Sequence, residues 1–216
     1  LLIRFLPGLL VLILVPSLAW GQTDNMPVSE ETVLDRTSDP VWLDSLYQSG
    51  TAFGQFLDEA QARRERWVSN YGDGTPDDAW TARADRLTGS WYLLAVAIDG
   101  CSDSVSTIPY LAHLANYSDQ ISMRIVLPES GRPIMEAHRT NDGRASTPTV
   151  LVLNERFEPV GAFIERPVGL KTWVETDGAD LPSRAFVREK FAWYEADGGR
   201  ETVATILAII ESASAE

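Results

Sequence analysis

The chain contains a single cysteine, Cys101, which stands directly after an Asp-Gly pair. A thiol acts as a nucleophile or a metal ligand in its deprotonated form. Ser104 follows three positions later, where a C-x-x-C motif would carry its second sulfur. One cysteine cannot form a disulfide within its own chain, so a complete dithiol cycle is excluded. What remains is the chemistry of a single thiol.

Other catalytic chemistries lack the residues that they need. The two histidines, His113 and His138, are far apart and neither has metal-ligand spacing to Cys101, so we predict no metal site. The sequence has no glycine-rich phosphate loop and no serine-hydrolase nucleophile motif. We therefore predict no cofactor.

A strand and a helix are expected to position the thiol between them. Residues 91–98 form an unbroken apolar run, typical of a strand buried on both faces, and apolar spacing predicts a helix over residues 102–116. Cys101 then stands at a helix N-terminus, where free N–H groups and the helix dipole favour the thiolate. Asp99 and Asp103 oppose this, because an anion disfavours a second one nearby. A reactive thiol and a buried, inert thiol therefore both stand as interpretations.

Further strands and helices follow the thiol. Strands are predicted at residues 121–127, 149–153 and 157–164, and helices at residues 133–139, 169–175, 183–194 and 201–212. This order makes a parallel β-α-β unit followed by a hairpin. It implies an α/β fold with a mixed central sheet flanked by helices.

Helices are also predicted before the first strand. Asp39-Pro40 is a typical N-cap with proline at the first helical position, and apolar residues then recur at helical spacing up to Val68. Thr75-Pro76, with Asp78 three residues after Thr75, resembles the capping box of a further short helix. We therefore expect an N-terminal helical extension.

The whole pattern resembles the thioredoxin family. "CSDS" occupies the place of the family's C-x-x-C, with Cys101 as the nucleophilic position, and Pro109 matches the family's helix-kinking proline. "STPTVLVL" resembles the family's cis-proline loop and the strand after it, which implies a cis Thr147-Pro148 bond. "PYLAHLA" and "ERP" match a bacterial branch whose active site reads W-C-G-D-S. The resemblance implies a thioredoxin-like fold.

The sequence departs from the family at several positions. Gly100 replaces the tryptophan that usually precedes the cysteine, and Ser102 replaces the glycine after it. Ala95 stands where many thioredoxins carry a buried acid that helps to move protons for the second sulfur. Its loss fits the absence of a resolving cysteine.

The resemblance implies thiol chemistry with Cys101 and Ser104 as the catalytic positions. The Ser104 hydroxyl could donate a hydrogen bond to a Cys101 thiolate, but it cannot resolve a mixed disulfide. Monothiol exchange remains, in which Cys101 attacks a partner disulfide or accepts a small-thiol adduct and an external thiol releases it. The expected partners are protein thiols or disulfides and a low-molecular-weight thiol.

Substrate contacts are expected from the residues around the cysteine and from the proline loop, namely Gly100, Ser102, Asp103, Thr147 and Pro148. A cis bond before Pro148 could leave backbone groups of Thr147 free to pair with an extended peptide. The alternative function is therefore a non-catalytic thioredoxin-fold module that binds an extended peptide or protein near this loop.

The N-terminal segment predicts export. Residues 1–21 carry one cation, a short apolar stretch and small residues before a cleavage point, which is typical of a secretory signal peptide and short for a membrane span. Residues 22–39 are polar and predicted to be a flexible tether. We assign residues 40–89 to the helical extension and residues 90–213 to the thioredoxin-like domain. The expected product is periplasmic or extracellular, without membrane attachment after signal cleavage.

The charge balance narrows the range of partners. The formal net charge is −13, from 31 acidic and 18 basic side chains. Nucleic-acid binding requires clustered basic residues, so we predict no nucleic-acid partner.

Overall fold

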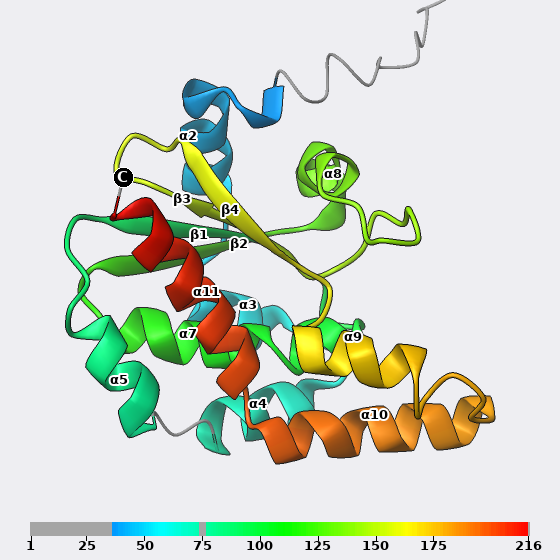
Figure 1. The fold of residues 1–216 in the computed structure, drawn as a ribbon. Helices are drawn as coiled ribbons and strands as arrows, with labels where there is room; N and C mark the ends of the chain where they lie inside the picture. The colour runs from blue at the N-terminus through cyan, green and yellow to red at the C-terminus, as the bar shows by residue number, and fades with distance from the viewer. Residues whose placement is uncertain (1–35, 74–76, 216) are drawn as a thin grey trace, which may run out of the picture.

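A mixed four-stranded sheet forms the centre of the computed structural model, which describes residues 36–73 and 77–215 (Figure 1). Its strands are β1 (Trp91–Val96), β2 (Ile121–Val126), β3 (Thr149–Leu153) and β4 (Pro159–Ile164), in the order β2-β1-β3-β4. β1 pairs parallel with β2 and antiparallel with β3, and β3 pairs antiparallel with β4. The predicted fold class is confirmed. The predicted signal peptide and most of the predicted tether lie outside the described residues.

The two central strands, β1 and β3, are buried on both faces because helices cover each side of the sheet (Figure 1). Leu94 and Val96 of β1 pack on one side with α2 (Pro40–Ser49) and α8 (Pro128–Ala137). Alternate residues of β1 and β3 point to the other side, where α7 (Ile108–Tyr117) and α11 (Arg200–Ala213) close the larger core. The apolar run of β1 is thus explained by two cores, one on each face.

The N-terminal extension consists of α2, α3 (Phe53–Glu59), α4 (Arg64–Asp73) and α5 (Asp78–Ala84). The predicted start of α2 is confirmed, since Val41 N donates to Asp39 Oδ1 over 3.0 Å and a proline occupies the first turn. The cap of α5 differs from the prediction: Asp77 accepts hydrogen bonds from Ala79 N and Trp80 N. An aspartate caps as well as a threonine does, and Asp77 is the residue next to the helix.

The helix expected over residues 102–116 is divided in two. α6 (Ser102–Val105) ends before Thr107, and α7 begins at Ile108. Pro109 has no N–H to donate to the Val105 carbonyl, so the helix cannot continue through this turn. Asn70 of α4 takes over that carbonyl with a side-chain hydrogen bond of 2.7 Å. The proline therefore leaves the Val105 carbonyl free to accept a hydrogen bond from the N-terminal extension.

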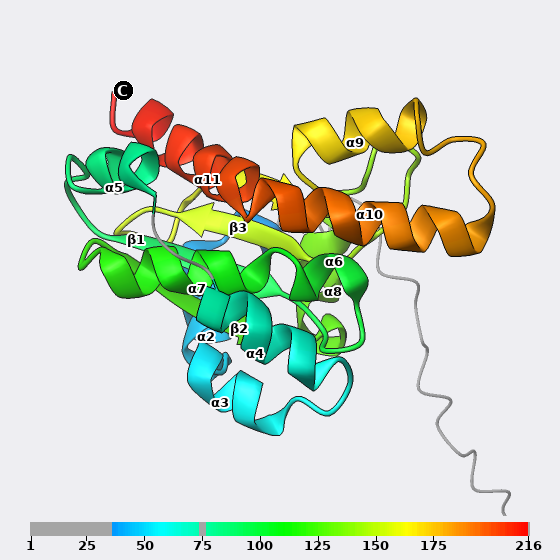
Figure 2. The same ribbon diagram turned by 90° about the horizontal axis from the view of Figure 1, so that it is seen from below.

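Three further helices complete the fold (Figure 2). α9 (Val168–Glu175), α10 (Ser183–Asp197) and α11 agree with the predicted helices to within a few residues. α8 begins at Pro128, five residues before its predicted start at Pro133, because proline is tolerated in the first turn and Pro133 is accommodated inside the helix. α10 runs beside α6, which brings the C-terminal part of the chain to the cysteine.

Candidate functional site

Cys101 is the N-cap residue of α6, as the sequence predicts. Its Sγ accepts a hydrogen bond from Ser104 N over 3.4 Å and donates one to the Thr147 carbonyl over 3.1 Å. The side chain is partly exposed. Because α6 has only four residues, its dipole is much smaller than that of the predicted long helix, and the direct N–H contact is the main local stabilisation of a thiolate.

The proline loop lies beside the cysteine. The Thr147-Pro148 bond is cis, which confirms the prediction. Thr149, the next residue, pairs with Val96 at the carboxyl end of β1, and Cys101 lies shortly after that strand. The register of two neighbouring strands therefore holds Thr147 against the thiol.

Ser104 contacts the thiol through its backbone N–H and not through its side chain. Its side chain is fully buried, and within the described part of the chain its hydroxyl has no hydrogen-bond partner. The hydrogen bond that we expected from this hydroxyl to Cys101 Sγ is absent in this structure, and the Ser104 N–H makes that contact instead. The backbone of α6 places this N–H at the sulfur because Cys101 caps the helix.

Asp103 is buried and surrounded by donors. Its carboxylate accepts hydrogen bonds from Lys190 Nζ at 3.0 Å, Tyr194 Oη at 2.9 Å and the Arg166 guanidinium at 3.3 Å. Burial and the neighbouring carboxylate raise the pKa of Tyr194 far above its usual value, so its phenol stays protonated and donates. The anion that was expected to oppose a Cys101 thiolate is thus offset by two cations.

These three partners were missed by sequence reasoning. Arg166 belongs to the "ERP" motif, but nothing in that motif shows its partner. Lys190 lies four residues after Phe186 and four residues before Tyr194, so helical spacing places the lysine on an inward face of α10. A lysine among inward-facing aromatic residues is a signal that a buried anion lies opposite.

The N-terminal extension holds the other side of the cysteine loop. Gln61 N and Ala62 N donate to Asp99 Oδ2 over 2.9 and 2.8 Å. Trp67 Nε1 donates to the Asp99 carbonyl over 3.0 Å, and Arg63 Nε donates to the Gly100 carbonyl over 2.8 Å. Burial alone would raise the pKa of Asp99, but the backbone N–H groups of Ala62 and Gln61 outweigh it and lower this pKa. The Asp99 carboxylate therefore binds the extension.

Asp99→Asn tests this contact by removing the charge while keeping the shape. A lowered folded-state pKa means that the carboxylate stabilises the protein above its unfolded-state pKa of about 3.9. That stabilisation disappears as the pH falls through the folded-state pKa. We expect urea unfolding to show the variant less stable than the wild type at pH 7, with the difference vanishing at an acidic pH below the folded-state pKa. An equal difference at both pH values would contradict this role of the charge.

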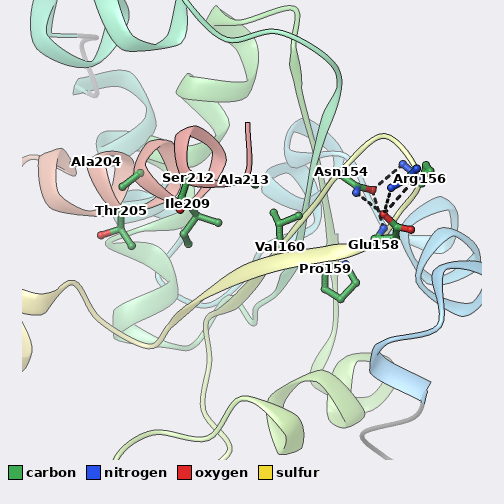
Figure 3. Close-up of a pocket in the computed structure, with 11 residues that line it drawn as sticks. Asn154, Arg156, Glu158, Pro159, Val160, Ala204, Thr205, Ile209, Ser212 and Ala213 are labelled. Carbon is green, nitrogen blue, oxygen red and sulfur yellow. Dashed lines mark hydrogen bonds and ion pairs between the residues drawn. The ribbon is translucent and has the colours of Figure 1, made fainter. Parts of the chain in front are cut away.

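The remaining candidates for a site lie elsewhere. A surface pocket between the β3–β4 hairpin and α11 is lined by residues that include Asn154, Val160 and Ile209 (Figure 3). It lies at the end of β3 opposite to Thr147, and no predicted site residue lines it. Across residues 36–73 and 77–215, no cluster of metal-ligating side chains occurs. In the same part of the chain, no helix is long and apolar enough to cross a membrane.

The strand order, the cysteine at a helix N-cap and the adjacent cis-proline define a thioredoxin-like fold with one cysteine beside the cis-proline. A family model described as thioredoxin matches residues 50–181, and the chain belongs to this family. The match includes every predicted site residue and part of the extension, but it ends before Lys190 and Tyr194.

Two solved structures share the fold. One is PA1234, a protein of unknown function from Pseudomonas aeruginosa, with 23% identity, a TM-score of 0.63 and coverage of 79% of this chain and 97% of that chain. The other is an HIV epitope-scaffold, also with 23% identity, a TM-score of 0.60 and coverage of 78% and 97%. The comparison with curated proteins found no match.

Proposed function

We propose that this chain is an exported protein that exchanges thiols with disulfides through Cys101. The observation that carries the proposal is the position of the cysteine. Its sulfur caps α6, is partly exposed and lies 3.1 Å from the carbonyl before a cis-proline. Export rests on the pattern of residues 1–21, and the periplasm or the extracellular space is the compartment that this pattern favours.

The reaction has two balanced steps. The Cys101 thiolate attacks one sulfur of a disulfide, a mixed disulfide forms, and the second sulfur leaves as a thiolate that takes up a proton. An external thiol then loses its proton and attacks the partner's sulfur in the mixed disulfide; a new disulfide forms between these two sulfurs, and Cys101 leaves as a thiolate. With Ser104 three residues on, the chain has no second thiol of its own, so the external thiol is an obligatory reactant.

Two measurements on the purified protein test the proposal. Wild-type protein incubated with glutathione disulfide is expected to gain one mixed-disulfide adduct by intact-mass spectrometry, and dithiothreitol should remove it. Cys101→Ser is the matched control, because it keeps the size of the residue and removes the sulfur. The proposal fails if Cys101 resists iodoacetamide in the folded protein yet reacts fully in urea.

Binding of an extended partner segment near Thr147-Pro148 is a second candidate function. Thr147 is only partly buried and its carbonyl faces Cys101, so a segment that passes over the sulfur also passes Thr147. Capture of partners from cell envelopes separates the two functions. If the chain exchanges disulfides, partners that a reducing agent releases from the wild type should be absent from Cys101→Ala. If the chain is a binding module, Cys101→Ala should retain its partner.

A further inference from the structure

Lys190 is a buried cation beside the cysteine loop. The residue is 4% exposed, and its ammonium donates to Ser102 Oγ over 2.8 Å and to both carboxylate oxygens of Asp103, at 3.0 and 3.2 Å. Ser102 follows Cys101 directly in the chain. Lys190 therefore contacts both residues that connect the thiol to the first turn of α6.

The cost of burying this cation has to be offset by its partners. An isolated buried ammonium loses its hydration, and one carboxylate with good geometry compensates for it. Asp103 also binds Arg166, whose side chain is 15% exposed and which pairs with the buried Glu165 as well. Arg166 thus divides its charge between two carboxylates, whereas among the described residues Lys190 forms its ion pair with Asp103 alone.

Other charged and titratable groups face this cluster from several elements. Arg166 from the end of β4 and Tyr194 from α10 bind Asp103, Glu165 binds Arg166, and Arg144 from the loop before β3 binds Glu165. Asp99 and Arg63 lie on the other side of the cysteine loop, where they contact the N-terminal extension and Gly100. Glu165 is paired with Arg144 and Arg166, and Asp99 is held by backbone N–H groups. The acids around the thiol therefore already have partners, and Lys190 contacts Ser102, the residue that directly follows Cys101.

We propose that Lys190 is a positioning residue for thiol exchange at Cys101. By binding Ser102 and Asp103, it fixes the turn that points Ser104 N–H at Sγ, and it offsets the Asp103 charge when the thiolate forms or leaves a mixed disulfide. The inference rests on the proposed function, and it assigns to α10 a part in the chemistry although the family match ends before this helix.

The test measures the rate of Cys101 alkylation by iodoacetamide between pH 5 and pH 10. Lys190→Met keeps the chain length of the side chain and removes its charge. We expect its rate at pH 7 to fall about tenfold and the midpoint of its pH–rate profile to rise by about one unit, because the Asp103 carboxylate loses one of its two cations and then disfavours a neighbouring thiolate more strongly. Lys190→Arg should restore the wild-type profile.

Tyr194→Phe is the matched control. It removes another donor to Asp103 from the same helix without changing the charge, so we expect its profile to stay within about threefold of the wild type. Equal loss in Lys190→Met and Tyr194→Phe would reduce Lys190 to a structural role and overturn the proposal. So would a folded Lys190→Met with the wild-type profile.

Ser102→Ala covers the case in which Lys190→Met does not fold. It removes one contact of the ammonium and buries no charge, and we expect alkylation to slow about two- to fivefold. The wild-type rate in Ser102→Ala would then overturn the proposal. Failure of the proposed function looks different, because wild-type Cys101 itself would then resist iodoacetamide in the folded protein.

Discussion

Asp103→Ala is expected to lower the free energy of unfolding by about 3–5 kcal/mol, because it leaves the buried Lys190 ammonium without its carboxylate. The variant also removes the acceptor of Tyr194 Oη and one partner of Arg166. Water cannot easily replace these contacts, since both Lys190 and Tyr194 are at most 4% exposed. Urea unfolding of the wild type and the variant at pH 7 measures the difference.

The double variant Asp103→Ala, Lys190→Met separates this cause from a loss of packing. Removing both partners of a buried ion pair leaves no unpaired charge, and such replacements are often close to neutral. We expect the double variant to regain most of the stability that Asp103→Ala loses. A single variant within about 1 kcal/mol of the wild type would contradict a buried, tightly paired Asp103.

Trp67→Ala is expected to cost a similar amount, about 3–5 kcal/mol, as a large-to-small change in a closed core. Trp67 is fully buried, and its ring packs against Phe56 and Phe53 at centroid distances of 5.1 and 6.3 Å. Its Nε1 donates to the Asp99 carbonyl two residues before the cysteine. The variant should therefore lose stability and also loosen the cysteine loop, which proteolysis and urea unfolding can measure.

Trp67→Phe divides these two effects. It keeps most of the aromatic volume and loses the indole N–H, so we expect a loss of about 1–3 kcal/mol from the unpaired carbonyl together with a smaller cavity. If Trp67→Phe is as unstable as Trp67→Ala, the hydrogen bond to Asp99 outweighs the packing. A change below about 1 kcal/mol in Trp67→Ala would contradict its place in the core.

Local patterns were sufficient to predict the sheet and the position of the thiol. β1 and β3 are unbroken apolar runs, and Asp39-Pro40 starts α2 through contacts within one turn. Cys101 at a strand–helix junction followed from the same apolar patterns, and the cis bond before Pro148 followed from the resemblance to thioredoxins. Each of these features depends on neighbours in sequence or on a motif that the family shares.

Contacts between residues far apart in the sequence could not be predicted from such local patterns. Asp103 accepts hydrogen bonds from Arg166, Lys190 and Tyr194, which lie 63, 87 and 91 residues away in the sequence. From its sequence neighbours, Asp103 was expected to be an unpaired anion beside the thiol. The cation and the hydroxyl that α10 brings to it are seen only in the packing of α10 on α6. Asp99 was misjudged for the same reason, since the backbone that binds its carboxylate lies in the extension.

The contacts of the extension also determine how much chain is needed for a stable cysteine loop. Residues 61–70 supply donors to Asp99, Gly100 and Val105, and Thr51 adds a backbone bridge to Ile125 at the edge of β2. A shortened protein that starts at Trp91 would leave these acceptors unpaired, at a cost of about 1–3 kcal/mol for each one that stays buried. We therefore expect the smallest piece that folds with an ordered thiol to begin well before the first strand, although the proposed chemistry lies after it.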